Sequence, residues 1–150
     1  MGSRKHNIAE RRKEERSKIA SARLNNCPTS PRKMRLVADL VRGTDVEQAL
    51  RILKTTPKHP AGRLHKLLLS AIDNWVAKNE GTRIEESALF VKTIMVDCGR
   101  VLKRVQPAPQ GRAHRVRKRS NHVTLVLGSR NDAKDKIQET ENEAKEIKVS

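Results

Sequence analysis

Apolar residues recur at helical spacing in three stretches of the chain. The first stretch begins with Ser30 as the capping residue and Pro31 at the first helical position, and it ends before Gly43. The sequence therefore predicts an amphipathic helix over about residues 31–42. Its inward stripe is expected to consist of Met34, Val37, Leu40 and Val41.

Two more helices follow. Asp45 and Gln48 form a variant of the capping box before a short second helix that ends before Pro57. Pro60 begins a longer third helix, which is predicted to end at Gly81. The inward residues are expected to be Val46, Ala49, Leu50 and Leu53 in the second helix, and Leu64, Leu67, Leu68, Ala71, Ile72, Trp75 and Val76 in the third. Because Trp75 lies within this stripe, a core position is favoured over nucleobase stacking.

Three strands are also predicted. Residues 20–24 and 121–127 alternate between apolar and polar positions, as half-buried strands do. Residues 89–96 are apolar at consecutive positions, which predicts a strand buried on both faces at the centre of its sheet. The inward residues of the two alternating strands are expected to be Ala20, Ala22, Leu24, Val123, Leu125 and Leu127.

The alternation of the last strand continues backward into a different chemistry. Residues 98–119 contain no Asp or Glu, and the turn sequence Pro107-Ala108-Pro109-Gln110-Gly111 lies in their middle. Burying an unpaired arginine in a core costs several kcal/mol, so these residues are expected to lie outside the core. The stretch is therefore predicted to leave the body as an extended β-hairpin over about residues 98–121. Its cations are Arg100, Lys103, Arg104, Arg112, Arg115, Arg117, Lys118 and Arg119.

The whole chain is strongly basic, with 33 Lys+Arg against 17 Asp+Glu and a formal net charge of +16. Such an excess attracts phosphate backbones or anionic lipid surfaces. The apolar runs are far shorter than the roughly 20 residues of a membrane span, and no secretory signal pattern is present, so nucleic acid is the favoured partner. With one Trp, one Phe and no Tyr, stacking readout of single strands is disfavoured. We expect binding to the backbone and shape of a folded RNA.

Residue types used in catalysis and metal binding are scattered. Cys27 and Cys98 lack a C-x-x-C pairing and are predicted to be partly buried thiols in a reducing cytosol. His114 and His122 lie in or beside the arginine run, where contact with phosphate is favoured over proton transfer because no carboxylate is near in sequence. Asp39 and Asp97 are isolated acids and are interpreted as surface or capping carboxylates. No enzyme activity, cofactor or metal is therefore expected.

Both ends fall outside the predicted core, and one domain over residues 20–128 is expected. Residues 1–19 form a basic arm that is predicted to be disordered or loosely helical until it meets a polyanion. Residues 129–150 form a charged tail, for which a marginal helix or disorder is expected.

Several motifs, in their order and spacing, closely resemble the bacterial large-subunit ribosomal protein L22 family. The resemblance runs from about Ala20 to Leu127. It is carried by Thr29 to Gly43 (TSPRKMRLVADLVRG), Ala49-Leu50, Pro57-Lys58, Leu68 to Asn74, Lys103-Arg104, Gly111-Arg112-Ala113 and Lys118 to Thr124 (KRSNHVT).

The resemblance implies an α+β fold, with three helices packed on a three-stranded antiparallel sheet and a long protruding β-hairpin. It also implies a structural role in the cytoplasmic large ribosomal subunit, with 23S-type rRNA, neighbouring large-subunit proteins and the nascent polypeptide as partners. In the family the hairpin threads the rRNA and its tip lines the peptide exit tunnel.

Carried over by position, the tunnel tip is Gln106, Pro107, Ala108, Pro109, Gln110 and Gly111. The family usually has basic residues at the positions of Ala108 and Gln110, so this tip carries two charges fewer. The hairpin cations Arg100, Lys103, Arg104, Arg112, Arg115, Arg117, Lys118 and Arg119 would hold the rRNA, and His114, Arg23, Arg32, Lys33, Arg35 and Arg42 are further candidates for rRNA binding. For the four cations of the first helix, Arg32, Lys33, Arg35 and Arg42, an ordinary solvated helix face remains an open alternative.

Two other hypotheses remain open from the sequence. A DNA architectural protein would use the hairpin as a minor-groove arm, although only Pro107 and Pro109 offer an apolar wedge at the tip. An RNA-processing enzyme would depend on His114 and His122.

Overall fold

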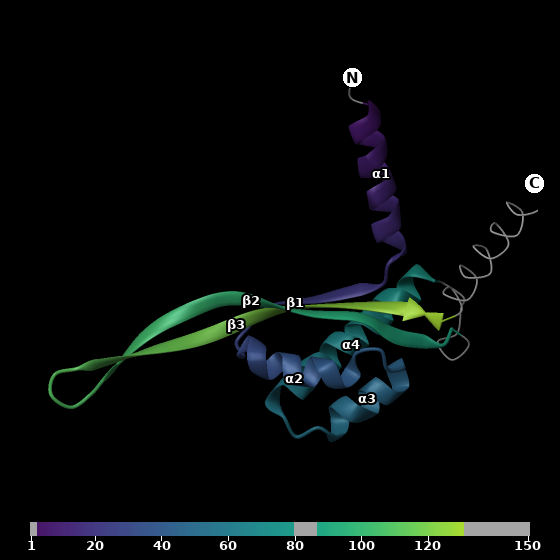
Figure 1. The fold of residues 1–150 in the computed structure, drawn as a ribbon. Coiled ribbons are helices and arrows are strands. Elements are labelled where there is room, and N and C mark those ends of the chain that lie inside the picture. The colour runs from purple at the N-terminus through teal and green to yellow at the C-terminus, as the bar shows by residue number, and fades with distance from the viewer. Residues whose placement is uncertain (1–2, 80–86, 131–150) are drawn as a thin grey trace, which may run out of the picture.

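The computed structural model describes residues 3–79 and 87–130 (Figure 1). Three helices cover one face of a three-stranded sheet, which confirms the predicted α+β fold, and a fourth helix lies in the N-terminal arm. The elements are α1 (Ser3–Lys18), β1 (Ser21–Cys27), α2 (Pro31–Val41), α3 (Val46–Thr55), α4 (His59–Lys78), β2 (Leu89–Pro107) and β3 (Ala113–Ser129).

The sheet is antiparallel with the strand order β1-β3-β2. The prediction that residues 89–96 form the central strand is therefore wrong, because β3 is central and β2 lies at an edge. A bulge at Lys92 explains the misleading pattern: Val91 pairs with Leu127 and Thr93 with Val126, so one extra residue reverses the alternation. The helices thus bury apolar residues of both parities, Leu89, Val91, Ile94 and Val96.

The edge of β2 that does not pair with β3 is covered by residues of α2 and of the loop that follows it. Backbone hydrogen bonds of 3.0 Å link Gly43 N–H to the carbonyl of Val91 and Val91 N–H to the carbonyl of Thr44. Arg35 donates from its guanidinium to the Val96 carbonyl at 3.0 Å, and Arg42 donates to the Ile94 carbonyl at 3.2 Å. These contacts satisfy edge groups that would otherwise be open to another strand.

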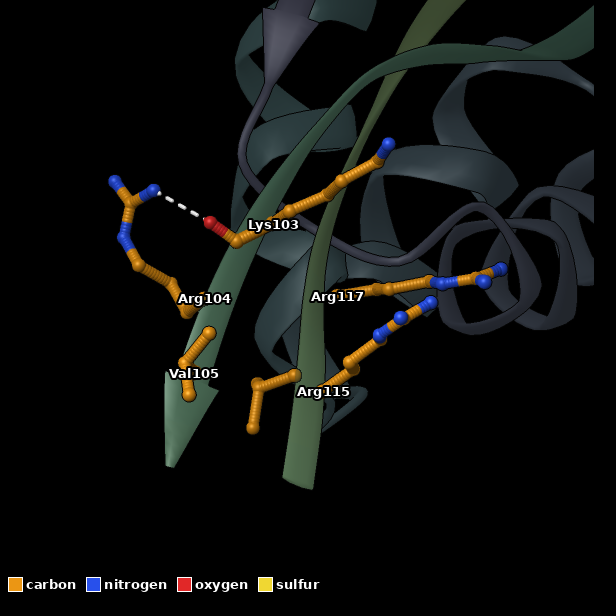
Figure 2. Close-up of a pocket in the computed structure, with 6 residues that line it drawn as sticks. Lys103, Arg104, Val105, Arg115 and Arg117 are labelled. Carbon is orange, nitrogen blue, oxygen red and sulfur yellow. Dashed lines mark hydrogen bonds between the residues drawn. The ribbon is translucent and has the colours of Figure 1, made fainter. Parts of the chain in front are cut away.

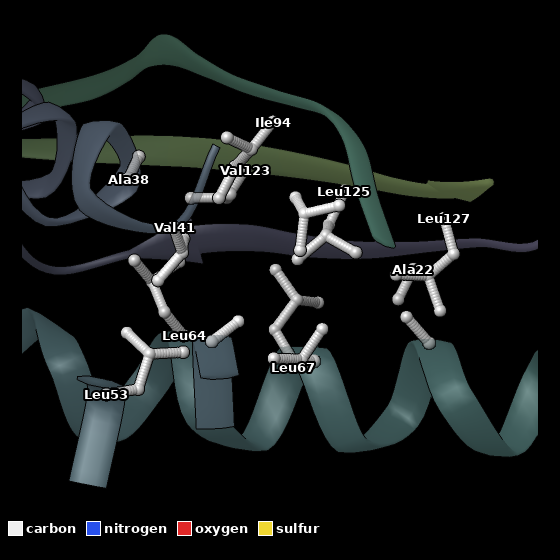
Figure 3. Packing of buried hydrophobic residues seen from close by; sticks show 14 of the residues in the cluster. Ala22, Ala38, Val41, Leu53, Leu64, Leu67, Ile94, Val123, Leu125 and Leu127 are labelled. Atoms are coloured by element: carbon white, nitrogen blue, oxygen red, sulfur yellow. The ribbon is translucent and has the colours of Figure 1, made fainter. Parts of the chain in front are cut away.

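The core lies between the sheet and α2, α3 and α4. In Figure 3, Val123 and Leu125 of the sheet face Leu64 and Leu67 of α4. Trp75 is only 9% exposed, which confirms its predicted core position.

Two inward predictions are wrong, since Leu40 is 46% exposed and Val76 is 41% exposed. Each lies at the border of its helical stripe. In α2, Ala38 is fully buried in the core.

The helix ends differ in detail from the sequence prediction. Ser30 and Asp45 occupy the N-cap positions of α2 and α3, but neither side chain makes a capping hydrogen bond. The predicted capping box is therefore wrong. Instead, the Asp45 carboxylate contacts the Arg130 guanidinium at 2.8 Å, and this guanidinium lies 5.8 Å from the centroid of the Phe90 ring. Helix α4 ends at Lys78, before the predicted end at Gly81, which lies outside the described residues.

The N-terminal arm adopts the helical one of its two predicted alternatives. Helix α1 projects away from the layer formed by α2, α3 and α4 (Figure 1). Its hydrophobic residues include Ile8, which is exposed. Of the predicted tail over residues 129–150, only Ser129 and Arg130 lie within the described part of the chain.

Candidate nucleic-acid interface

Strands β2 and β3 continue beyond the helices as a two-stranded ribbon, as predicted (Figure 1). We define the ribbon as residues 99–120. Its ladder runs from the Val101–Arg119 pair to the Pro107–Ala113 pair. The Lys and Arg side chains of the ribbon are all exposed, and the ribbon contains no carboxylate.

A second bulge marks the base of the ribbon. Cys98 pairs with Asn121 and Val101 with Arg119, so two residues of β2 lie opposite Ser120 alone. A Cβ atom on Gly99 would lie 2.9 Å from the Ser120 Oγ and 3.1 Å from its carbonyl carbon. Only glycine fits at this point without a shift of the β3 backbone.

The base is also anchored to the loop between β1 and α2. Asn121 is fully buried, and its Nδ2 donates to the Thr29 carbonyl at 2.7 Å and to the Thr29 Oγ1 at 3.0 Å. The Cys27 Sγ lies 2.9 Å from the same hydroxyl and accepts a hydrogen bond from Arg63 at 3.1 Å. This network fixes the point at which the ribbon leaves the body.

The two cysteines differ in environment. Cys27 is buried but Cys98 is exposed, so the prediction of two partly buried thiols is wrong for Cys98. Among the residues that the structure describes, no group of three or more His, Cys, Asp or Glu side chains is placed to hold a metal ion. Within the same residues, no helix is long and apolar enough to cross a membrane.

The turn at the tip falls at the predicted residues. Ala108 N–H donates to the Arg112 carbonyl at 2.8 Å, and Arg112 N–H donates to the Pro109 carbonyl at 3.4 Å. Gln110 and Gly111 have φ values of 62° and 69°. Two successive positive φ values are the requirement of a type I′ turn, whose twist matches that of the strands.

The register of the ladder sorts the ribbon into two faces, because residues directly opposite each other point to the same side. The core-side face continues the face that the helices bury in the body, and it has four cations. The opposite face has two cations. The core-side face comprises Val101, Lys103, Val105, Arg115, Arg117 and Arg119; the opposite face comprises Leu102, Arg104, Gln106, His114, Val116 and Lys118.

The candidate cations outside the ribbon lie on two other elements, α2 and β1. Arg32 and Lys33 are exposed on the first turn of α2, where the positive end of the helix dipole adds to their charge. Arg23 pairs with Thr124 on the sheet face that is turned away from the helices. The structure therefore places the predicted site residues on three elements: the ribbon, α2 with its C-cap, and β1.

Two of the candidates on α2 already have partners within the protein. Arg35 and Arg42 are bound to carbonyls of β2, as described above, and Arg42 also contacts Asp39 at 2.6 Å. Asp39 is exposed, which agrees with its interpretation as a surface carboxylate, although it is paired with Arg42 rather than isolated. Since a guanidinium has five N–H donors, both arginines keep donors for a further ligand.

The sequence interpretation missed the apolar residues of the ribbon. Val105 is 71% exposed and Leu102 is also exposed, so both lie in contact with solvent beside the cations. The sequence does contain a signal for them: Val101, Lys103 and Val105 occupy every second position, so a strand places the two valines on the same face as the lysine. His122 lies outside the ribbon, in the part of β3 that belongs to the body, and its Nδ1 accepts a hydrogen bond from Asn26 N–H at 3.1 Å.

The fold and this surface together define a class of protein: a small α+β domain whose sheet extends into a cationic ribbon without carboxylates. Residues 22–128 match the family described as ribosomal protein L22p/L17e, and the chain belongs to this family.

Similar proteins carry one name across several bacteria. The chain is 65% identical over 132 residues to the large ribosomal subunit protein uL22 of Christiangramia forsetii, a match that covers 88% of this chain and 98% of the relative. The protein of the same name from Flavobacterium johnsoniae is 64% identical over 132 residues, with 88% and 96% covered. That of Bacteroides fragilis strain ATCC 25285 is 56% identical over 135 residues, with 90% and 98% covered.

Proposed function

We propose that this chain is a structural, non-catalytic constituent of the large ribosomal subunit in the cytoplasm, and that its ribbon binds and crosslinks folded rRNA. Membership of the L22p/L17e family and the names of the relatives support the ribosomal role. One observation carries the RNA-binding role. The sheet face that is apolar beneath the helices becomes cationic on the ribbon, and no carboxylate of the ribbon neutralises it.

Binding is electrostatic and geometric. Seven residues of β2, from Val101 to Pro107, form the ribbon arm, which spans about 20 Å at about 3.3 Å per residue. Arginine forms bidentate hydrogen bonds with phosphate oxygens. Because both faces of the ribbon have cations, phosphates from two RNA segments bind at once, and this is the crosslink. Each neutralised phosphate releases counterions. For every phosphate contact, the logarithm of the binding constant therefore falls by about 0.7–0.9 when the salt concentration rises tenfold.

The remaining surfaces extend this interface. Residues 20–128 act as the rRNA-binding domain, residues 1–19 as a basic arm and residues 129–150 as a charged tail. Neighbouring large-subunit proteins are further partners. The proposed rRNA-binding residues are those of the ribbon (Arg100, Lys103, Arg104, Arg112, His114, Arg115, Arg117, Lys118 and Arg119), of α2 and its C-cap (Arg32, Lys33, Arg35 and Arg42), and Arg23 of β1.

The tip, residues 106–111, lines the exit tunnel and faces the nascent polypeptide. No residue of this segment is charged, and two prolines and a type I′ turn hold its backbone. A neutral, stiff tip presents a shaped wall to the nascent chain without attracting or repelling charged segments of it.

The test compares two variants that lose the same number of charges. Arg115→Gln/Arg117→Gln removes two cations from the ribbon, and Lys54→Gln/Lys66→Gln removes two exposed cations from α3 and α4. Each protein is incubated with large ribosomal subunits that lack it and is sedimented through gradients of rising salt. The ribbon variant should dissociate at lower salt than the wild type, while the helix variant should follow the wild type.

Equal behaviour of both variants would overturn rRNA binding by the ribbon. Failure of the wild type itself to stay with the subunits at moderate salt would overturn the structural role.

A further inference from the structure

The surface of the ribbon has an open cavity of about 360 Å³, at the lower end of the range of about 300–1000 Å³ for small-ligand sites. It lies halfway along the arm, where the two strands are directly paired. The residues that line it are Lys103, Arg104, Val105, Arg115, Val116 and Arg117.

The side chains around the cavity are unequal in direction. Figure 2 shows Lys103, Arg115 and Arg117 pointing to one side of the ribbon, which is the core-side face, and Arg104 pointing to the other. The Arg104 Nη1 donates to the carbonyl of Lys103 at 2.9 Å. The lining residues therefore come from both faces of the ribbon. Lys103, Arg115 and Arg117 lie on the core-side face, Arg104 and Val116 lie on the opposite face, and no acidic residue is among them.

The wall of the cavity also has an apolar part. Val105 shares the core-side face with these cations, as the partner of Arg115 in the ladder. At 71% it is the most exposed large hydrophobic side chain of the described residues. A valine side chain cannot bind a phosphate, but removal of its apolar surface from water by a ligand is favourable.

A ligand that uses the whole site needs an anionic group for the cations and a flat apolar group for Val105. A nucleotide has both. Its phosphate accepts hydrogen bonds from arginine, and its base packs against an aliphatic side chain or stacks on a guanidinium plane. A base within a stacked duplex offers no free ring face, so the nucleotide has to be unstacked.

We propose that this cavity binds one unstacked nucleotide of the RNA, with its phosphate on Arg115 and Arg117 and its base against Val105. The inference rests on the proposed RNA-binding function and deepens it. The ribbon then holds most phosphates without regard to sequence, but it fixes its position along the RNA by capturing one base.

The experiment titrates the full-length protein with adenosine 5′-monophosphate or ribose 5-phosphate into the millimolar range and follows methyl and guanidinium NMR signals. Adenosine monophosphate should shift the methyl signals of Val105 and the side-chain signals of Arg115 and Arg117. Ribose 5-phosphate should shift the arginine signals only. Equal effects of the two ligands, or no effect on Val105, would overturn the base site.

A pair of isosteric variants sharpens the result. Val105→Thr replaces one methyl group of the site by a hydroxyl, and Val101→Thr makes the same change on the same face outside the cavity lining. Val105→Thr should weaken adenosine monophosphate binding by roughly fourfold, the factor for about 0.8 kcal/mol of lost apolar burial. Val101→Thr should leave it unchanged, and equal weakening by both variants would contradict the proposal.

The sedimentation test of the ribbon arginines separates this inference from the proposed function. If the wild type needs Arg115 and Arg117 to stay on the large subunit while Val105 does not respond to adenosine monophosphate, the base site fails and rRNA binding stands. If neither result is obtained, both fail.

Discussion

The same two strands form both the core sheet of the body and the ribbon, and one face of that sheet runs through both regions. In the body this face carries Val96, Val123 and Leu125 and is covered by helices. On the ribbon the same face carries Lys103, Arg115 and Arg117 and is covered by nothing within the described chain. The strand pairing is shared, so the difference lies in the partner that each half of the face is built to meet.

The change from an apolar to a cationic face takes place over three successive pairs on this face. Val96–Val123 is the last apolar pair, Cys98–Asn121 is the boundary, and Val101–Arg119 begins the cationic segment. Asn121 suits the boundary because its amide is buried and bonded to Thr29, which joins the sheet to the loop before α2. Stability of the body and binding by the ribbon should therefore respond to different substitutions on one strand.

The largest expected effect separates the two halves of β3. Leu125→Ala removes a fully buried side chain and should lower the free energy of unfolding by about 2–5 kcal/mol, since it leaves a cavity beneath the helices. Arg117→Ala, on the same face of the ribbon, should change it by less than about 0.5 kcal/mol. Urea unfolding of the free proteins measures both. A loss of similar size in both variants would show that the ribbon contributes to the fold of the body.

A smaller effect concerns the base of the ribbon. Gly99→Ala places a methyl group 2.9 Å from the Ser120 Oγ and should destabilise the bulge by about 1–3 kcal/mol. Gly62→Ala is the control, because its Cβ meets nothing within 4 Å and alanine is the better helix former by about 1 kcal/mol. The two variants should shift the thermal midpoint in opposite directions. An unchanged thermal midpoint in Gly99→Ala would mean that the bulge accommodates a Cβ atom without strain.

The sequence predicted most of this fold because most segments bury a single face. The stripes of α2, α3 and α4 and the alternation of β3 follow directly from that rule. The bulge at Lys92 did not, because an inserted residue makes a half-buried edge strand look apolar on both faces. Arg35 and Arg42 resemble the ribbon cations in sequence, yet they bind the edge carbonyls of β2, a pairing that only tertiary structure creates.

The candidate site was predictable in part for the same reason. Unpaired arginines at strand spacing identify the ribbon, since they have no place in a core. The cavity beside Val105 was not predictable, because it depends on which side chains the register places opposite one another.

The smallest expected effect concerns the turn that closes the ribbon. Gln110 has a φ of 62°, a conformation that costs an ordinary residue about 1 kcal/mol and that asparagine adopts more readily. Gln110→Asn should therefore slow hydrogen exchange of the Ala108 amide, which donates across the turn to Arg112. Gly111→Ala, with its own φ of 69°, should accelerate the same exchange. Neither change should affect the body, so a difference in global unfolding between the two variants would contradict the separation of ribbon and body.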